Sequence, residues 1–179
     1  MQLWSLMMKN IEIEDMSTEF EVGILQKSDV DIVYNLSIKN SIYYQYHPPM
    51  VTRERILEDM DSLPPGKTLN DKYCIGFFER DKLIAVMDLI MDYPKKNTAF
   101  IGLFMMDVNY QNKGIGSKVI GEVLSYLKSE NYENIRLGGD KGNPQSYSFW
   151  NKNGFATVGD FGDFCNYGMF IVCMRAAAY

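Results

Sequence analysis

A glycine-containing loop near the middle of the chain constrains the fold more than any other feature. It follows an apolar run of strand length, Phe100–Met106, and it carries glycine at positions 114 and 116. Downstream, apolar side chains recur at the spacing of one helix face. These are Ile115, Val119, Ile120, Val123, Leu124 and Leu127. The pattern predicts a strand, a tight loop and an amphipathic helix, in that order.

The start of such a helix attracts anions. Its first amides have no partner within the helix, and the aligned peptide dipoles add partial positive charge there. Gly114 and Gly116 carry no Cβ, so a phosphate can approach the backbone closely and the turn can adopt positive φ. From this pattern alone, two glycines that serve only the turn remain the alternative.

Two motifs resemble those of one family. Gln111, Gly114 and Gly116 are similar to the Gln/Arg-x-x-Gly-x-Gly/Ala signature of the GNAT superfamily of N-acetyltransferases. Residues 143–155 are similar to its Asn-x-x-Ala-x-x-Leu-Tyr-x-x-x-Gly-Phe segment. The order and spacing match those of the family, and the resemblance covers residues 70–175.

The resemblance implies an α/β fold. We expect one GNAT-like domain over residues 19–179, with a mixed sheet whose central parallel strands splay apart and are flanked by helices. Residues 1–18 form an N-terminal extension without assigned structure. The family further implies acetyl-CoA as the acyl donor, and transfer of acetyl to a primary amine by direct attack on the thioester. The motifs do not identify that amine.

Several residues are implied to bind acetyl-CoA. In the family the loop amides hold the pyrophosphate, and the pantetheine arm bonds to the fourth strand. Asn143 matches a residue that touches this arm; an N-cap before Pro144 is the other interpretation, and one side chain can do both. The expected binding residues are Phe104, Met105, Met106, Gln111, Asn112, Lys113, Gly114, Ile115, Gly116, Ser117, Asn143 and Trp150.

Proton transfer departs from the family pattern. Trp150 stands where many members carry a tyrosine that protonates the leaving thiolate, and an indole N–H cannot act as that acid. Tyr147 lies three residues earlier, on about the same helix face, so we expect Tyr147 to be the catalytic hydroxyl. Packing of its ring without a role in proton transfer is the alternative. Gly138 replaces a glutamate base of some members. Asp88, Asp107 or a chain of waters is then left to deprotonate the amine.

The acceptor pocket is expected at two segments that flank the thioester in this family. One is Tyr43–His47, and the other holds Asp160 and Asp163, whose charges favour a cationic amine. Packing of the aromatic side chains and a solvated acidic turn are the alternatives.

Two other functions fit parts of the sequence. Because position 150 is tryptophan and position 138 is glycine, a non-catalytic module that binds acyl-CoA as a sensor or scaffold is the alternative to an enzyme. A dinucleotide-binding oxidoreductase is disfavoured, because Val119 replaces the third glycine of the required GxGxxG motif.

Charge and composition exclude several partners. Lys and Arg total 18 against 23 Asp and Glu, a net charge of −5, so nucleic acid is not an expected partner. One histidine and three cysteines without ligand spacing predict no metal. Without a signal peptide or a run of bilayer length, we expect a cytoplasmic protein with no membrane contact. A homodimer is left open.

The remaining elements follow from periodicity and turn signals. The pair Pro48-Pro49 should end any preceding helix, so residues 40–50 are expected to be an aromatic loop. We expect strands at 20–25, 73–79, 83–91, 99–106, 134–138, 155–159 and 169–174, and helices that begin at Ser28-Asp29, Thr52, the glycine loop and Asn143.

Overall fold

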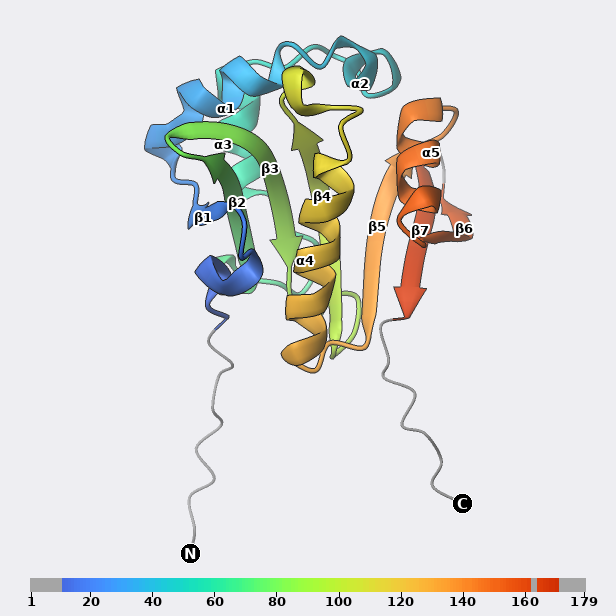
Figure 1. The fold of residues 1–179 in the computed structure, drawn as a ribbon. Coiled ribbons are helices and arrows are strands. Elements are labelled where there is room, and N and C mark those ends of the chain that lie inside the picture. The colour runs from blue at the N-terminus through green and yellow to red at the C-terminus, as the bar shows by residue number, and fades with distance from the viewer. Residues whose placement is uncertain (1–10, 162–163, 171–179) are drawn as a thin grey trace, which may run out of the picture.

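A computed structural model describes residues 11–161 and 164–170 (Figure 1). One seven-stranded sheet has the order β1-β2-β3-β4-β5-β7-β6. Its strands are β1 Glu21–Ile24, β2 Lys72–Glu79, β3 Lys82–Ile90, β4 Thr98–Met106, β5 Asn134–Asp140, β6 Ala156–Phe161 and β7 Phe164–Phe170. The helices are α1 Val30–Ser37, α2 Ser41–Tyr46, α3 Arg53–Asp61, α4 Ile115–Ser129 and α5 Pro144–Lys152. Short 3₁₀ turns are η1 Ile13–Met16, η2 Lys27–Asp29, η3 Leu69–Asp71 and η4 Val108–Tyr110.

The sheet is mixed, and its one parallel pair lies near the centre. β4 and β5 pair from Thr98 opposite Asn134 to Ile101 opposite Leu137. Beyond that point both strands continue, and no further pairing joins them in the part of the chain that the structure describes. All other neighbouring strands are antiparallel. This α/β architecture, with two parallel strands that diverge, confirms the expected fold class.

The two faces of the sheet are covered by different helices. Successive side chains of a strand point to opposite faces. On β3, Met87 packs with the apolar side of α4, whereas Val86 packs with α1 and α3. Figure 1 shows α4 running along β4. Among the described residues, no helix is both long and apolar enough to cross a membrane.

Residues 11–16 belong to the core on the α4 face. Ile11, Ile13 and Met16 are buried there, and Ile13–Met16 form η1. The next residues are tied to α4, because the Glu122 carboxylate accepts hydrogen bonds from the Thr18 amide at 3.1 Å and from its hydroxyl at 2.8 Å. The mixed pattern of residues 1–18 carries no periodic signal for this packing, so it does not assign a structure to them.

Two segments differ from the expected elements. Residues 41–46 form the short helix α2 instead of an aromatic loop, because Tyr43 and Tyr44 pack against the α1–α3 core; the chain leaves the helix just before Pro48. The last strand begins at Phe164 instead of Met169, because β7 pairs along the whole of β5, from Phe164 opposite Asp140 to Phe170 opposite Asn134. The expected residues 171–174 lie outside the described part of the chain.

Candidate active site

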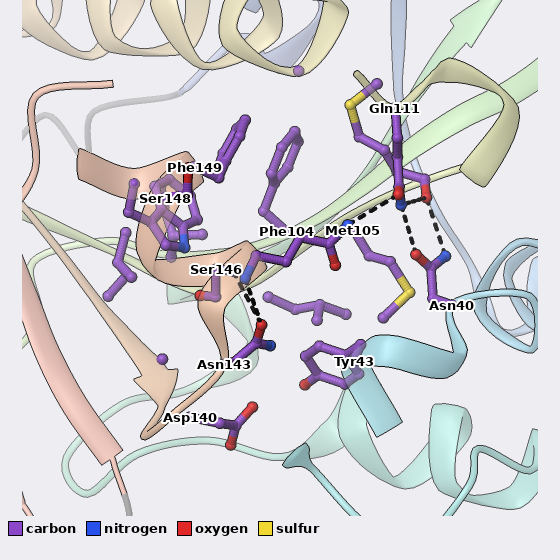
Figure 2. Close-up of a pocket in the computed structure, with 18 of the residues that line it drawn as sticks. Asn40, Tyr43, Phe104, Met105, Gln111, Asp140, Asn143, Ser146, Ser148 and Phe149 are labelled. Carbon is purple, nitrogen blue, oxygen red and sulfur yellow. Dashed lines mark hydrogen bonds between the residues drawn. The ribbon is translucent and has the colours of Figure 1, made fainter. Parts of the chain in front are cut away.

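A cavity of about 920 Å³ occupies the gap where β4 and β5 diverge. Its volume lies at the upper end of the range for small-molecule sites. The lining side chains come from both faces of the sheet. Phe149 and Trp150 pack with the α4-side core, whereas Tyr43 and Met105 pack with the α1–α3 core. The cavity therefore passes through the sheet, and Figure 2 shows Phe104 and Met105 between Phe149 and Tyr43 in that view.

One end of the cavity is the first turn of α4. Gly114 is the N-cap in a left-handed conformation, with φ of 79°, and its carbonyl accepts the first helical bond from the Lys118 amide at 3.1 Å. The amides of residues 115–117 therefore have no partner within the helix, and no side chain in the described part of the protein caps this end. A Cβ built on Gly114 meets no described atom within 4 Å. The space beside the Gly114 Cα is therefore open, and the first turn of α4 lines the cavity, which leaves room for an anion there.

The second glycine has a different role. A Cβ at Gly116 would lie 2.7 Å from the Met106 sulfur and 3.1 Å from a Phe149 ring carbon. Only glycine lets α4 approach β4 and α5 this closely. Gly114 thus provides a backbone conformation, and Gly116 provides the space for close packing.

Gln111 belongs to a hydrogen-bond network that the sequence did not reveal (Figure 2). Its Nε2 donates to Asn40 Oδ1 at 2.8 Å and to the Met106 carbonyl at 3.2 Å. Asn40, which is buried, donates to the Met106 carbonyl at 3.0 Å and to the Leu36 carbonyl at 3.1 Å. Gln145 Nε2 donates to Gln111 Oε1 at 3.1 Å. The network holds the ends of α1 and β4 and the start of α5 around the cavity.

Asn143 and Trp150 place α5 against the cavity. Asn143 is buried, and its Oδ1 accepts bonds from the Gln145 and Ser146 amides, both at 3.1 Å, so it is the N-cap of α5. The Trp150 ring is buried against Phe149 and Phe155, with centroids 5.0 Å from each. Both Asn143 and Trp150 line the cavity.

The structure brings most of the predicted acetyl-CoA residues together. The lining includes Phe104, Met105, Met106, Gln111, Asn112, Gly114, Gly116, Ser117, Asn143 and Trp150. Lys113, Ile115 and Tyr147 are not among the described residues that line this cavity.

Tyr147, the predicted acid, is 58% exposed. Because Tyr147 is exposed and is not among the described residues that line the cavity, we expect Tyr147→Phe to leave kcat within about twofold of the wild-type value. A general acid typically contributes ~10²-fold or more. Steady-state kinetics with a turned-over amine would test this. A tenfold fall in kcat with unchanged acetyl-CoA affinity would instead support Tyr147 as the acid.

The two carboxylates considered as bases are held elsewhere. Asp88 pairs with the Lys72 ammonium at 3.0 Å. Burial tends to raise the pKa of Asp107, but bonds from the Asn109 amide and side chain and from Lys82 outweigh it and lower that pKa. Neither carboxylate is among the described residues that line the cavity. Their positions do not suit them to receive a proton from an amine there.

The other end of the cavity holds a histidine–carboxylate pair. His47 Nδ1 lies 2.9 Å from Asp140 Oδ1, and the two side chains are 38% and 10% exposed. The Tyr43 and His47 rings lie 5.3 Å apart. Burial and then the charge of Asp140 raise the pKa of Tyr43, so this phenol stays protonated at neutral pH.

Sequence reasoning placed Tyr43 and His47 near the acceptor but gave Asp140 no role. Asp140 lies at the carboxyl end of a central parallel strand, where ligands bind in open α/β sheets. That position could have identified it as a site residue. The side chains of Asp160 and Asp163 lie outside the part of the chain whose side chains are described.

Comparison with known proteins agrees with this fold. Residues 34–155 match the model of the acetyltransferase (GNAT) family. The fold is similar to that of an acetyltransferase from Thermus thermophilus, with a TM-score of 0.71 and 17% identity over 84% of this chain and 96% of that one. It is also similar to that of PaiA N-acetyltransferase from Thermoplasma acidophilum, solved in complex with coenzyme A. This match has a TM-score of 0.66 and 20% identity, and it covers 84% of this chain and 98% of that one. A third similar structure is a spermidine N-acetyltransferase chimera from Vibrio cholerae and hSSAT. This match has a TM-score of 0.66 and 17% identity, and it covers 86% of this chain and 96% of that one.

The family match covers well over half of the sequence, so the chain belongs to the GNAT acetyltransferase family. In general terms, this membership supports acetyl transfer that depends on an acyl-CoA. The structural neighbours are less than 25% identical, and they support the fold alone.

Proposed function

We propose that this protein transfers acetyl from acetyl-CoA to a primary amine by direct attack on the thioester. One observation carries the proposal. A single cavity joins the open amides at the start of α4 to the His47–Asp140 pair, and it passes between two strands that diverge.

The α4 end suits the donor. The amides of residues 115–117 provide donors for a pyrophosphate, and the open space at Gly114 leaves room for it. Beyond Ile101, β4 turns its free edge toward the gap, where its backbone groups can pair with the amides of a pantetheine arm. Its N–H groups can also stabilise negative charge on the thioester oxygen. Asn143 and Trp150 would lie beside this arm.

The α2 end suits a cationic acceptor. Asp140 places a carboxylate in the cavity wall, and the chain carries a net charge of −5. A partly desolvated carboxylate attracts an ammonium ion more strongly than an exposed one does. Spermidine, the substrate in the name of one structural neighbour, is a polycation of this class and is our first candidate.

The proposal is tested by two measurements on the full chain. First, acetyl-CoA should raise the melting temperature, because a ligand that binds only the folded state stabilises it by mass action. Second, release of CoA thiol should be measured with spermidine, a peptide with a free α-amine, and a lysine peptide. We expect acetylated product, identified by mass spectrometry, from at least one of these amines.

The replacement of the family tyrosine by Trp150 favours one competitor, a non-catalytic acyl-CoA sensor or scaffold. A raised melting temperature without transfer to any amine would support that competitor and contradict the enzymatic proposal.

A further inference from the structure

The strongest unassigned feature is the pair formed by His47 and Asp140. His47 is the single histidine of the chain and follows the last residue of α2, where its amide bonds to the Tyr43 carbonyl at 3.0 Å. Asp140 ends β5, 93 residues away in sequence. Two separate elements thus bring an imidazole and a carboxylate to 2.9 Å in the wall of the cavity.

We propose that His47 accepts the proton that the amine must lose before it attacks, and that Asp140 is the positioning residue that orients the imidazole. This inference rests on the proposed function, and it assigns the base that the family motifs leave open.

The contact with Asp140 determines which ring nitrogen of His47 can accept a proton. A carboxylate only accepts hydrogen bonds, so at 2.9 Å from Asp140 the proton of a neutral His47 ring lies on Nδ1. The basic lone pair is then on Nε2. The side chain is 38% exposed and lines the cavity, so an amine entering there can reach the ring.

The other groups near this end are weaker candidates. Tyr43 faces the ring from α2, but burial and the charge of Asp140 raise its pKa, so it is protonated and cannot accept a proton at neutral pH. Asp140 faces the ring from β5 and is engaged by Nδ1. Elsewhere in the cavity lining, Ser146 and Ser148 offer neutral hydroxyls, and Lys152 offers a cation.

The substrate ammonium gives one proton to His47 Nε2, and the freed nitrogen lone pair attacks the thioester carbonyl carbon. A C–N bond forms, the C–S bond breaks, and its electron pair leaves on sulfur. The new amide nitrogen loses its second proton while the thiolate gains one. The imidazolium then returns its proton to solvent, so one proton is released per acetyl group transferred.

The first test is kinetic. His47→Gln keeps a polar side chain but cannot accept a proton, so we expect kcat to fall by ~10²- to 10⁴-fold, the usual contribution of general base catalysis. The acetyl-CoA Kd should change by less than about twofold. Ile42→Ala, a change at an exposed α2 residue outside the cavity lining and outside the 43–47 segment, is the control and should behave as wild type. Spermidine is the first acceptor to use, followed by the peptide amines.

The second test measures by NMR which nitrogen of the His47 ring carries the proton. With one histidine in the chain, a ¹⁵N-labelled sample gives one pair of imidazole resonances. We expect the shifts of a ring protonated on Nδ1, and loss of that preference in Asp140→Asn together with a fall in kcat. Asp81→Asn, in the β2–β3 turn, is the control and should leave the tautomer and kcat unchanged.

The outcomes separate the two proposals. Wild-type kcat in His47→Gln would overturn the role of His47 while leaving the acetyltransferase function in place. A ring protonated on Nε2 would overturn the role of Asp140. A wild-type chain that binds acetyl-CoA but acetylates no amine would overturn the function, and this inference with it.

Discussion

Gly114→Tyr should weaken acetyl-CoA binding by on the order of 100-fold, which is ~2.7 kcal/mol, and leave the chain folded. The new side chain would stand in the open space before the α4 amides, where we place the pyrophosphate. It would also occupy a left-handed conformation at φ 79°, which costs a side chain ~1–2 kcal/mol of stability. Calorimetric titration with acetyl-CoA gives the affinity, and a thermal scan gives the stability.

Gly66→Tyr is the matched control for that experiment. Gly66 has nearly the same φ, +81°, a Cβ added there would meet no described atom within 4 Å, and the residue does not line the cavity. Both variants should lose similar stability, and only Gly114→Tyr should lose affinity. Equal acetyl-CoA affinity in the two would contradict the placement of the pyrophosphate at α4.

Lys72→Met should destabilise the fold by ~3–5 kcal/mol, the usual result when one partner of a buried ion pair is removed. The Lys72 side chain is 2% exposed and pairs with Asp88 at 3.0 Å. It also donates to the Asp59 carbonyl, and to the Ser62 carbonyl at 2.8 Å, both at the end of α3. In the described structure the buried Asp88 Oδ1 already has no hydrogen-bond partner. Without Lys72, this largely buried carboxylate would lose the cation that compensates its charge.

The pH dependence of this loss has a definite sign. Burial raises the pKa of Asp88 in the folded state, and Lys72 is the main influence that opposes the rise. Removing Lys72 raises that pKa further, so the folded chain binds the proton more tightly than the unfolded chain does. Stability of the variant therefore falls as pH rises from the unfolded pKa through the folded one. The deficit should be smallest in acid and largest at neutral pH, as measured by urea unfolding.

Two further variants check the cause. Lys67→Met breaks the more exposed pair with Asp71, at 3.5 Å, and should cost less than ~1 kcal/mol. In the Lys72→Met background, Asp88→Asn should recover part of the loss and flatten the pH dependence. A double variant no more stable than Lys72→Met would show that the bonds to the end of α3, not the buried charge, carry the effect.

Local sequence signals predicted most of the fold. Helix α4 and the β2–β3 hairpin have clear periodicity and turn residues, and Thr52 caps α3 through a bond from the Arg55 amide, as expected. Helix α2 was missed because its six residues are held by contacts of Tyr43 and Tyr44 with a distant core. The start of β7 was missed because its partner, β5, determines it.

The residues of the candidate site also differ in whether the sequence predicts them. The glycine loop and the Asn143 cap lie in short contiguous motifs, and the sequence shows them. The contact between Asn40 and Gln111 joins residues 71 apart, and that between His47 and Asp140 joins residues 93 apart. No local pattern connects such residues, so only the folded chain reveals that they meet.

The divergence of β4 and β5 also bears on aggregation. Free strand edges attract strands of other chains, and proteins usually protect such edges at the rim of a sheet. In this protein, the unpaired edges of β4 and β5 face each other in the middle of the sheet. Helix α4 covers one face there, and α2 lies at the cavity on the other face. A foreign strand would have to enter between these helices. The fold thus leaves the unpaired backbone groups of β4 and β5 accessible to a narrow ligand, but not to a strand of another protein.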